Sequence, residues 1–452
     1  MTPPKPPVRP DRVSLWRYLR LFRQDILSAQ PARLYRAWMA EFRTPFFRSY
    51  LCNDPKLIST VLTGRPGDFP KSDRIGEGLR PLLGRSVFLT NGAEWEHQRR
   101  IIDPAFERGR LRDTFPALLA AGRGFVDRIG ARAGEVVEAE AETAHAAAVA
   151  IFRTLFSIPI EDRVAAEVHQ RFRDYQRAQP LLNLAAFVPL PRWMPRFHRR
   201  RTIYDAAAIR LLIRGLTDLR ALQIARGEAP DDLATKIMTM RDPVTGKGFD
   251  VAEMVDQVAI FFLAGHETSA SALAWALYLL ATHPDVQARA AAEAAALPEE
   301  PAFGDIAKLR LIRDVFRETL RLYPPVPMMV REARCPVEFR GRRVRKGSQI
   351  VISPWHLHRH ERIWDNPDAF DPDRWSSEAG RAQSRDGYLP FSAGPRVCPG
   401  AGFAMAEGPL FLALLLRRFR ITAAPGEAPV PVAYLTVRSK SGICLRFEHL
   451  TG

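Results

Sequence analysis

The chain has 452 residues, of which 46% are hydrophobic and 26% charged, a composition that predicts a globular protein with a large core and excludes global disorder. Lys and Arg outnumber Asp and Glu by 66 to 50, and this excess favours acidic partners or anionic membranes. The basic residues are nevertheless scattered singly, without a tail or an aromatic-interleaved patch, so we expect no binding to nucleic acid.

The cysteines also narrow the class of protein. The four of them form no CxxC pair and have no regular spacing, so they predict neither a disulfide framework nor a zinc site, and they fit a reducing compartment. No signal-peptide pattern opens the chain, and nowhere do 18 apolar residues run together. We therefore expect a cytoplasmic protein that is soluble or attached to a membrane only at its surface.

The first elements along the chain are a basic arm and a short amphipathic helix. Residues 1–12 are rich in proline, which predicts a disordered or extended arm without a packing role, ahead of a single domain formed by residues 13–452. Apolar residues then recur at helical spacing from Leu15 to Ile26, with arginines between them. This pattern fits either a membrane-surface helix or a first helix packed on its own domain.

Long helical patterns dominate the second half of the chain. We predict helices over residues 255–282, in the alanine-rich stretch after Pro284, and over residues 306–322, where two prolines follow. Before them, the Pro- and Arg-rich stretch 189–201 is predicted to be a mobile surface loop between two helices.

The pattern of apolar and polar residues changes after these predicted helices. Residues 337–352 alternate apolar and basic side chains around two glycines, which predicts a small antiparallel sheet. Residues 370–391 are rich in turn residues and have little periodicity, and a final apolar helix is predicted over residues 402–416. No internal repeat and no Gly/Ser-rich linker divides the chain.

Cys398 differs from the other cysteines through its neighbours in the segment FSAGPRVCPG. Gly394 allows a tight turn, Arg396 brings a positive charge two residues away, and Gly400 leaves space for a flat ligand. Backbone amides beyond the cysteine and the N-terminus of the following helix point positive ends at the sulfur. The sequence therefore predicts a stabilised thiolate at Cys398, whereas the other three cysteines are expected to be small buried residues.

This segment resembles the haem-ligand loop FxxGxRxCxG of the cytochrome P450 family at every fixed position, with Phe391, Gly394, Arg396, Cys398 and Gly400 in place. The resemblance implies that Cys398 is the thiolate ligand to the iron of a b-type haem. It also implies the fold class, which is mainly α with small β-sheets, a triangular helical prism that encloses the haem.

A second motif, Glu318 and Arg321 in the sequence ETLR, resembles the ExxR motif of the same family, and its spacing puts both charges on one helix face. Alone, such a pair would be an ordinary surface pair. Downstream, FDPDRW around Arg374 resembles the segment whose arginine completes a buried triad with ExxR. The resemblance implies that the triad holds the Cys398 loop, because loss of one member would leave a buried charge without its partner.

The third motif, AGHETS at residues 264–269, lies near the centre of the predicted helix 255–282. Gly265 weakens a helix by roughly 1 kcal/mol, which suggests the close approach of another group to the backbone. The motif resembles the family's oxygen groove, which implies that Thr268 donates a hydrogen bond to dioxygen and that Glu267 supports proton delivery. A hydroxyl bonded to the preceding helical turn is the structural alternative for Thr268.

Haem propionates are anionic and need cationic or donor partners when they are buried. Trp95 and Arg99, four residues apart in AEWEHQRR, resemble the family's WxxxR pair that meets one propionate, and two further arginines match its other propionate contacts. The cofactor contacts that the resemblance implies are Trp95, Arg99, Ala264, Gly265, Arg331, Phe391, Arg396, Cys398 and Gly400.

The resemblance further implies a monooxygenase that inserts one oxygen atom from O2 into its substrate. The family's substrate-facing segments correspond here to residues 79–88, 179–189, 261–264 and 327–330 and to the loop near Leu435. These segments are largely apolar, which implies a hydrophobic small molecule. The sequence of the chain resembles fatty-acid and terpenoid hydroxylases more than it resembles the camphor type.

The two electrons that this reaction needs must come from outside, because no flavin-, nicotinamide- or iron–sulfur-binding segment lies in the chain. We expect a separate ferredoxin or flavodoxin, with its reductase. The acidic face of this electron donor is expected to dock on basic residues such as Arg99, Arg100, Arg396, Arg417 and Arg418.

Two alternatives to a monooxygenase stay open. Among enzymes, the alternative is a peroxide-driven peroxygenase, against which Glu267 and Thr268 argue. Outside enzymes, it is a non-catalytic haem-binding sensor.

Overall fold

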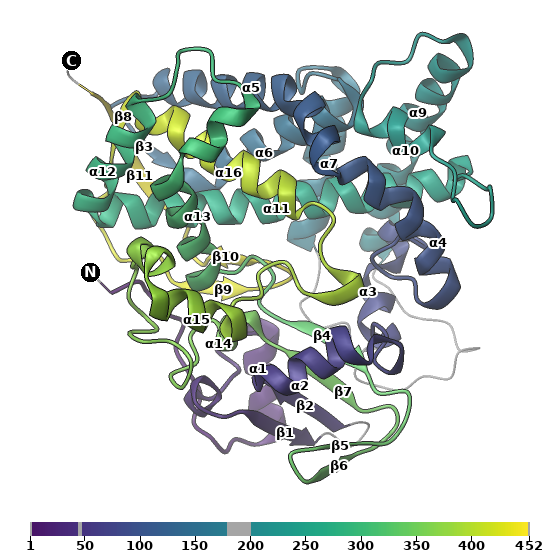
Figure 1. The fold of residues 1–452 in the computed structure, drawn as a ribbon, viewed down its shortest axis with the longest axis vertical. Coiled ribbons are helices and arrows are strands. Elements are labelled where there is room, and N and C mark those ends of the chain that lie inside the picture. Colours follow the sequence, from purple (N-terminus) through teal and green to yellow (C-terminus); the bar gives the residue numbers. More distant parts are fainter. Residues whose placement is uncertain (1, 44–47, 179–199, 451–452) are drawn as a thin grey trace.

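The computed structural model describes residues 2–43, 48–178 and 200–450. Helices fill most of the molecule, and most of the strands gather at its lower end in Figure 1. The helices of the described residues are α1 (Leu15–Gln24), α2 (Pro55–Ser59), α3 (Asp73–Leu83), α4 (Gly92–Ile102), α5 (Arg108–Gly130), α6 (Ala139–Phe156), α7 (Arg163–Ala178), α9 (Arg200–Arg226), α10 (Leu233–Thr239), α11 (Val251–Thr282), α12 (Pro284–Ala295), α13 (Arg310–Leu322), α14 (Pro354–Leu357), α15 (Glu378–Gly387) and α16 (Ala401–Leu416). The strands are β1 (Met39–Arg43), β2 (Arg48–Cys52), β3 (Val136–Glu138), β4 (Met329–Glu332), β5 (Val337–Phe339), β6 (Arg342–Val344), β7 (Gln349–Ile352), β8 (Phe419–Ala423), β9 (Pro431–Ala433), β10 (Val437–Ser439) and β11 (Cys444–His449).

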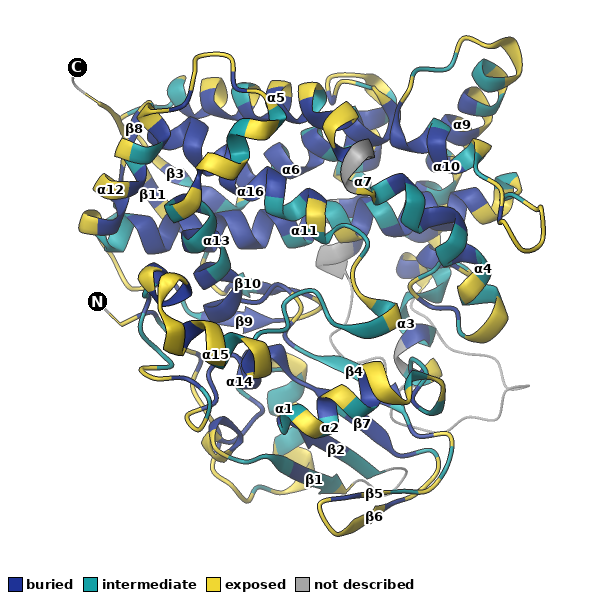
Figure 2. Ribbon diagram, viewed as in Figure 1, coloured by how far each residue is buried: buried dark blue, intermediate teal, exposed yellow. Residues whose placement is uncertain are grey.

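Helix α11 crosses the middle of the molecule and is almost entirely buried (Figures 1 and 2). It begins four residues before the predicted start, at a capping box in which the Asp250 side chain accepts a hydrogen bond from the Glu253 N–H at 2.8 Å. Residues 254–263 pack into one apolar cluster, with α3, α6, α7 and α9, and residues 272–280 pack into another, with α5, α13 and α16. The motif at residues 264–269 therefore lies where the two clusters meet.

The main sheet has the strand order β1-β2-β7-β4. β5 and β6 form the antiparallel hairpin that the sequence predicts, closed by Arg340 and Gly341, which both have positive φ. β7 instead leaves this hairpin and pairs in parallel with β2, with Ser49 opposite Gln349. The predicted small antiparallel sheet over 337–352 is therefore corrected, because β7 lies between β2 and β4 in the main sheet and does not pair with the hairpin.

Two helices also differ from the sequence prediction. A short 3-10 helix, Phe303–Lys308, comes first, so α13 begins only at Arg310. α15 forms inside the segment predicted as turns, because the Ser377 hydroxyl caps it by accepting from the Gly380 N–H at 3.0 Å. The loop predicted at 189–201 falls almost wholly outside the described residues.

The N-terminal arm, which the sequence predicts to be disordered or extended, packs against the rest of the chain. The Arg9 Nε donates to the Ala29 carbonyl at 2.6 Å, and the Tyr323 hydroxyl donates to the Pro4 carbonyl at 3.0 Å. The prediction of an arm without a packing role is therefore wrong, because its backbone and its arginine satisfy buried polar groups. The treatment of residues 13–452 as a single domain stays a prediction.

The predicted amphipathic helix forms as α1, capped by the Ser14 side chain, and ends at Gln24. None of its residues is buried, so it does not pack into the core in the way that α11 does. None of the described helices combines the length and the apolar character that crossing a bilayer requires.

Candidate active site

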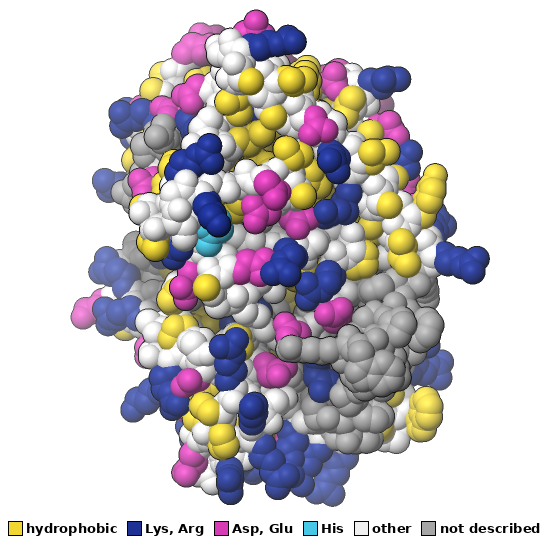
Figure 3. Space-filling view, turned by 90° about the vertical axis from the view of Figure 1, so that its right-hand side faces the viewer, with side chains coloured by type: hydrophobic (Ala, Val, Ile, Leu, Met, Phe, Trp, Pro, Cys, Tyr) yellow, Lys and Arg dark blue, Asp and Glu magenta, His cyan; other side chains and the backbone are white. Residues whose placement is uncertain are grey.

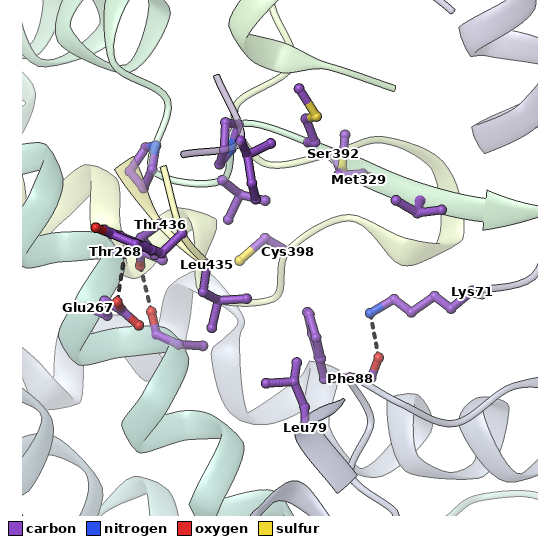
Figure 4. Close-up of a pocket in the computed structure, with 18 of the residues that line it drawn as sticks. Lys71, Leu79, Phe88, Glu267, Thr268, Met329, Ser392, Cys398, Leu435 and Thr436 are labelled. Atoms are coloured by element: carbon purple, nitrogen blue, oxygen red, sulfur yellow. Dashed lines mark hydrogen bonds between the residues drawn. The ribbon is translucent and has the colours of Figure 1, made fainter. Parts of the chain in front are cut away.

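A cavity of about 1890 Å³ lies beside α11, between the loop before α16, strand β4 and the N-terminal segment. Residues from five distant parts of the sequence meet in it (Figure 4). The predicted cofactor and catalytic residues that line it are Trp95, Arg99, Ala264, Gly265, Glu267, Thr268, Arg331, Phe391, Arg396, Cys398 and Gly400.

The wall of this cavity is largely made of apolar side chains. Leu79, Phe88, Phe261, Met329 and Leu435 come from three of the segments predicted to face the substrate and from the last loop. The fifth predicted segment, residues 179–189, lies outside the described residues. The cavity is thus suited to an apolar guest.

Cys398 lies in the loop between a short 3-10 helix, Gly394–Arg396, and α16. Its N–H donates to the Phe391 carbonyl at 2.9 Å. Gly394 has a φ of 67°, and a Cβ there would collide with the Leu62 carbonyl, so this position requires glycine. The loop lies against Leu62 and exposes the Cys398 sulfur to the cavity (Figure 4).

Burial raises the pKa of the Cys398 thiol, while the N–H groups of Gly400 and Ala401 and the cations Arg99 and Lys71 oppose this rise. The amides are those that the sequence predicts, and the cations that oppose the rise are Arg99 and Lys71 in place of the predicted Arg396. A stabilised thiolate at Cys398 stays a prediction, since burial has the larger effect in the protein alone. A metal cation bonded to the sulfur would supply the missing stabilisation.

Four cations share one side of the cavity: Lys71, Arg99, Arg331 and Arg396. Burial lowers the pKa of Arg331 to about 10. Burial and the neighbouring arginines lower the pKa of Arg396 to about 9, and the same causes lower that of Lys71 well below its usual value. These groups would be stabilised by an anion placed between them.

The protein itself supplies little negative charge here. Within the described ranges, Arg99 pairs with Asp103 at 2.7 Å, but no salt bridge joins a carboxylate to Lys71, Arg331 or Arg396. Instead the Arg396 guanidinium lies 4.1 Å from the centre of the Trp95 ring and donates to the Thr90 carbonyl. Cations without protein anions beside them are suited to pair with the two propionates of a haem. The Cys398 sulfur, which faces the same cavity, is suited to be the ligand to its iron.

Lys71 is the one member of this cluster that the sequence reasoning missed. Its Nζ donates to the Phe88 carbonyl at 2.7 Å and lies 3.8 Å from the centre of the Phe88 ring. Its backbone forms an isolated bridge with Arg331, which brings the two cations together. No local motif marks this lysine, because its role depends on a strand far along the chain.

The three residues of the predicted triad meet outside the cavity. Glu318 accepts two hydrogen bonds from Arg321, at 2.8 and 2.9 Å, and the Arg374 Nε lies 3.4 Å from the same carboxylate. The exposed fractions of Glu318 and Arg321 are 0%, and that of Arg374 is 6%. Arg321 also donates to the carbonyls of residues 358, 367 and 369, so the triad is satisfied internally.

A hydrogen-bonded path links this triad to the cysteine loop. Burial lowers the pKa of His358 to about 3, so the ring is neutral and contacts the Arg321 carbonyl through Nδ1 at 3.2 Å. Its Nε2 then accepts from the Leu389 N–H at 2.8 Å, two residues before Phe391, which accepts from Cys398. His358 is a second residue that the sequence reasoning missed.

The glycine of the α11 motif faces another helix. A Cβ at Gly265 would collide with the side chain of Ile151 on α6, so the close approach inferred from the sequence is at least in part that of α6. The Thr268 hydroxyl donates to the Ala264 carbonyl at 2.6 Å, which is the structural alternative, although Thr268 also lines the cavity.

Glu267 is held by the last loop of the chain. It is 6% exposed, and its Oε1 accepts a hydrogen bond from the Thr436 hydroxyl at 2.7 Å and another from Arg438 (Figure 4). Neither partner was found from the sequence, because both lie on or beside β10, far from the α11 motif. The Thr436 hydroxyl and the Arg438 guanidinium therefore hold the Glu267 carboxylate in place next to Thr268, and we call this pair of hydrogen bonds the clamp on Glu267.

The predicted docking residues of an electron donor do not share one outer surface. Arg99 and Arg396 line the cavity, and Arg100 is paired through two nitrogens with the buried Asp242, at 2.6 and 3.0 Å. Of the five predicted residues, these three are thus engaged elsewhere, and the two arginines after Leu416 remain near the surface. The docking of an electron donor on these five arginines stays a prediction.

A cysteine exposed to an apolar cavity, uncompensated cations beside it and a buried Glu–Arg–Arg triad together define a haem-thiolate protein. The sequence model of the family described as Cytochrome P450 matches residues 43–444. The chain belongs to the cytochrome P450 family, whose members bind haem b and use O2, and it is an oxidoreductase of the monooxygenase type.

Individual relatives agree with this assignment. A cyclooctat-9-en-7-ol 5-monooxygenase of Streptomyces melanosporofaciens is 33% identical over 423 residues, which cover 92% of this chain and 87% of that protein. Cytochrome P450 4A11 of Homo sapiens is 30% identical over 419 residues, which cover 88% of this chain and 79% of that protein. The crystal structure of a cytochrome P450DA heme domain matches with a TM-score of 0.81 at 25% identity and covers 99% of this chain and 98% of that one. The predicted fold class is confirmed.

Proposed function

We propose that this enzyme inserts one oxygen atom of O2 into a hydrophobic small molecule of the fatty-acid or terpenoid kind, with Cys398 as the ligand to the haem iron. One observation carries this proposal: the Cys398 sulfur and a group of cations without protein anions face the same apolar cavity. When bound, the haem supplies the activation of O2 and the transfer of one oxygen atom to a C–H or C=C bond.

The residues of the cavity wall then have separate tasks. Lys71, Arg99, Arg331 and Arg396 would hold the propionates, and Trp95 would keep Arg396 in place by its ring contact. Ala264, Gly265, Phe391 and Gly400 would contact the flat face and edges of the haem, and the triad of Glu318, Arg321 and Arg374 would hold the cysteine loop. These assignments follow from position and charge alone.

Thr268 and Glu267 would handle protons. The Thr268 hydroxyl holds its proton toward the Ala264 carbonyl, and rotation about χ1 turns that proton into the cavity. Glu267 has to exchange the hydrogen bonds of Thr436 and Arg438 before its carboxyl group passes a proton toward Thr268. Proton delivery would therefore depend on the last loop as well as on α11.

The substrate would be large and apolar. The cavity has room for a haem and for a guest beside it, and its wall includes Phe88, Phe261, Met329 and Leu435. A relative over 92% of the chain is named for the oxygenation of cyclooctat-9-en-7-ol, an alcohol with a carbocyclic skeleton, which supports a terpenoid-like guest.

Electrons would come from a separate ferredoxin or flavodoxin with its reductase, in the cytoplasm, where the four free cysteines stay reduced. A Cβ at Gly402 would collide with Leu111, so the start of α5 lies against the turn after Cys398. Arg112 is exposed there and is proposed to meet an acidic donor. Arg112→Glu is expected to slow reduction and to weaken its salt dependence, whereas Arg226→Glu, on a distant exposed site, is expected to leave both unchanged.

The central test is the optical spectrum of the reduced protein with carbon monoxide, for the wild type, Cys398→Ser and the control Cys444→Ser. A strongly red-shifted Soret band in the wild type and the control, absent from Cys398→Ser, supports thiolate ligation. A band at the ordinary histidine-haem position in the wild type contradicts it. Substrate-dependent NADH consumption with a reconstituted donor then distinguishes the monooxygenase from a peroxygenase or a sensor.

A further inference from the structure

The α1 segment has two faces with different surroundings. Leu15, Tyr18 and Phe22 line the cavity, so this face of α1 is part of the cavity wall. The exposed Arg12 and Arg23 line the same cavity, which shows that it reaches the surface at α1. The entrance on this side is therefore framed by apolar and cationic side chains of the N-terminal segment.

The outer face of α1 is cationic and carries one large aromatic side chain. Trp16 is 84% exposed, the highest value among the large apolar side chains of the described residues. Arg17, Arg20 and Arg23 are exposed around it and form no ion pair within the described part of the chain, and no acidic residue occurs from position 12 to position 24. An exposed Trp with neighbouring uncompensated arginines is typical of a helix at a lipid–water interface.

This exposure does not result from a loosely attached chain end. Before α1, the Arg9 N–H donates to the Gln30 carbonyl and the Arg9 side chain donates to the Ala29 carbonyl, so the segment ahead of the helix is tied to the segment after it. The buried Asp25, at the end of α1, accepts from the Ala433 N–H at 2.6 Å and from the Leu27 N–H at 3.0 Å. The helix is thus fixed at both ends while none of its own residues is buried.

A second element adds positive charge at the same end of the molecule. The hairpin of β5 and β6 lies at the lower end in Figure 1, as does α1, and Lys and Arg side chains gather at that end in Figure 3. Arg343, Arg345 and Lys346 are exposed there and form no ion pair among the described residues. Over the rest of the face in Figure 3, acidic and basic side chains alternate.

We propose that α1 docks on the surface of an anionic lipid bilayer, with Trp16 at the interface and Arg17, Arg20 and Arg23 among the lipid headgroups. The cavity entrance framed by Arg12 and Leu15 then lies against the bilayer. A hydrophobic substrate passes from the lipid into the cavity without crossing water. Only this last point rests on the proposed function, whereas the docking rests on charge, exposure and the fixed position of α1.

A lipid surface fits these features better than an acidic protein does. An aromatic side chain exposed on nearly all sides offers no shaped surface to a folded partner, but it fits the interfacial layer of a bilayer. Anionic headgroups attract clustered arginines over a distance set by ionic strength, without a fixed pairing geometry.

The test is co-sedimentation of the haem-loaded protein with vesicles of phosphatidylcholine, with and without phosphatidylglycerol, at low and high salt. The test variant is Arg17→Gln/Arg20→Gln/Arg23→Gln. The control, Arg226→Gln/Arg420→Gln/Arg446→Gln, removes the same charge from exposed arginines outside α1. Trp16→Ala is compared with Tyr204→Ala, a change of another exposed aromatic residue, which is 69% exposed on α9.

The wild type and the control triple variant are expected to bind only the anionic vesicles, and salt is expected to release them. The α1 triple variant is expected to lose affinity by on the order of a hundredfold, and Trp16→Ala to bind less than Tyr204→Ala. Equal binding of the two triple variants, or no binding of the wild type at low salt, would overturn the proposal. Binding is measured without turnover, so its failure leaves the proposed oxygenation untouched, and the carbon-monoxide spectrum shows whether each variant has folded around its haem.

Discussion

Two groups of buried charges in this protein differ in how they are neutralised. In the triad, Glu318 lies between Arg321 and Arg374, and Arg321 donates its remaining hydrogen bonds to backbone carbonyls. Beside the cavity, burial lowers the pKa of both Arg331 and Arg396, and Arg331 lowers that of Arg396 further. Within the described residues, neither arginine is paired with a carboxylate.

This difference separates a structural group from a binding group. The charges of the triad are satisfied by the chain itself, so it stabilises the fold whether or not a ligand is present. The cavity cations repel one another until an anion arrives, so the chain is less stable there than it would be with apolar side chains. The triad should therefore respond to mutation through folding, and the cation cluster through ligand affinity.

The largest expected effect is that of Glu318→Gln. This change leaves the guanidinium groups of Arg321 and Arg374 buried without their counter-charge, and it should lower the free energy of unfolding by about 3–5 kcal/mol. Urea unfolding of the purified protein measures it. Glu378→Gln, an exposed change at the start of α15, is the control and should stay within about 0.5 kcal/mol of the wild type. A loss below 1 kcal/mol for Glu318→Gln, on the order of the worth of a surface pair, would remove the distinction between the two groups.

Glu407 gives a case between the two groups, since it is a buried acid that accepts a hydrogen bond from the Ser269 hydroxyl. Burial raises its pKa from 4.5 to about 8, against the lowering effect of Ser269. The folded state therefore binds the proton more tightly than the unfolded chain, and stability should fall as the pH rises from about 4.5 to about 8.

In Glu407→Gln this fall should disappear, because the amide does not titrate, and the variant should be more stable than the wild type at pH 8 by about 4 kcal/mol. The free energies of unfolding of both proteins, measured between about pH 4.5 and pH 8, test whether stability falls as the pH rises. Glu427→Gln, an exposed change, should leave the pH dependence as it is in the wild type. A parallel pH dependence in Glu407→Gln and the wild type would show that Glu407 is already ionised.

Arg331→Met tests the binding group directly. Without haem, the free energy of unfolding of the variant should equal that of the wild type or exceed it by up to about 2 kcal/mol. The reason is that an apolar side chain replaces a buried cation that has no protein anion beside it. Its affinity for haem should fall by roughly tenfold to a hundredfold, the worth of a charge-assisted hydrogen bond. Arg334→Met, an exposed neighbour, should change neither quantity. Lower stability of the haem-free Arg331→Met variant would place this arginine with the triad.

The smallest expected effect belongs to the clamp on Glu267. The side chain of Arg438 is 35% exposed, so Arg438→Gln should cost about 1 kcal/mol or less in the free energy of unfolding, and the Thr436 hydroxyl still donates to Glu267. Arg438→Lys should recover most of this loss. Thermal unfolding of both variants measures it, and a loss as large as that of Glu318→Gln would mean that the clamp belongs to the structural group.

Sequence reasoning reached furthest where a local pattern carries the chemistry. The loop around Cys398, the pair Glu318 and Arg321 and the α11 motif are short segments with fixed spacing; the structure places the first and the last at one cavity and pairs Glu318 with Arg321. The fold class followed from the family resemblance that these motifs carry, and the long helices followed from helical periodicity, which is a local property.

It failed where a position depends on a distant partner. Lys71 joins the cations through a bridge with Arg331, and Thr436 reaches Glu267 from the end of the chain. The parallel pairing of β7 with β2 and the packing of the N-terminal arm are of the same kind. Periodicity and propensity contain no term for contacts between segments so far apart.

The anchorage of the N-terminal segment has a practical consequence for anyone who shortens this chain. The Asp25 carboxylate accepts a hydrogen bond from the Ala433 N–H on β9, and β9 pairs with β10. Arg438 on β10 in turn donates a hydrogen bond to Glu267. Removal of residues 1–26 therefore takes away a support of the strand pair behind Glu267, as well as one wall of the cavity. Residues 2–26 should be kept in any shortened chain, and an affinity tag placed before them should be removable without residual residues that displace the arm.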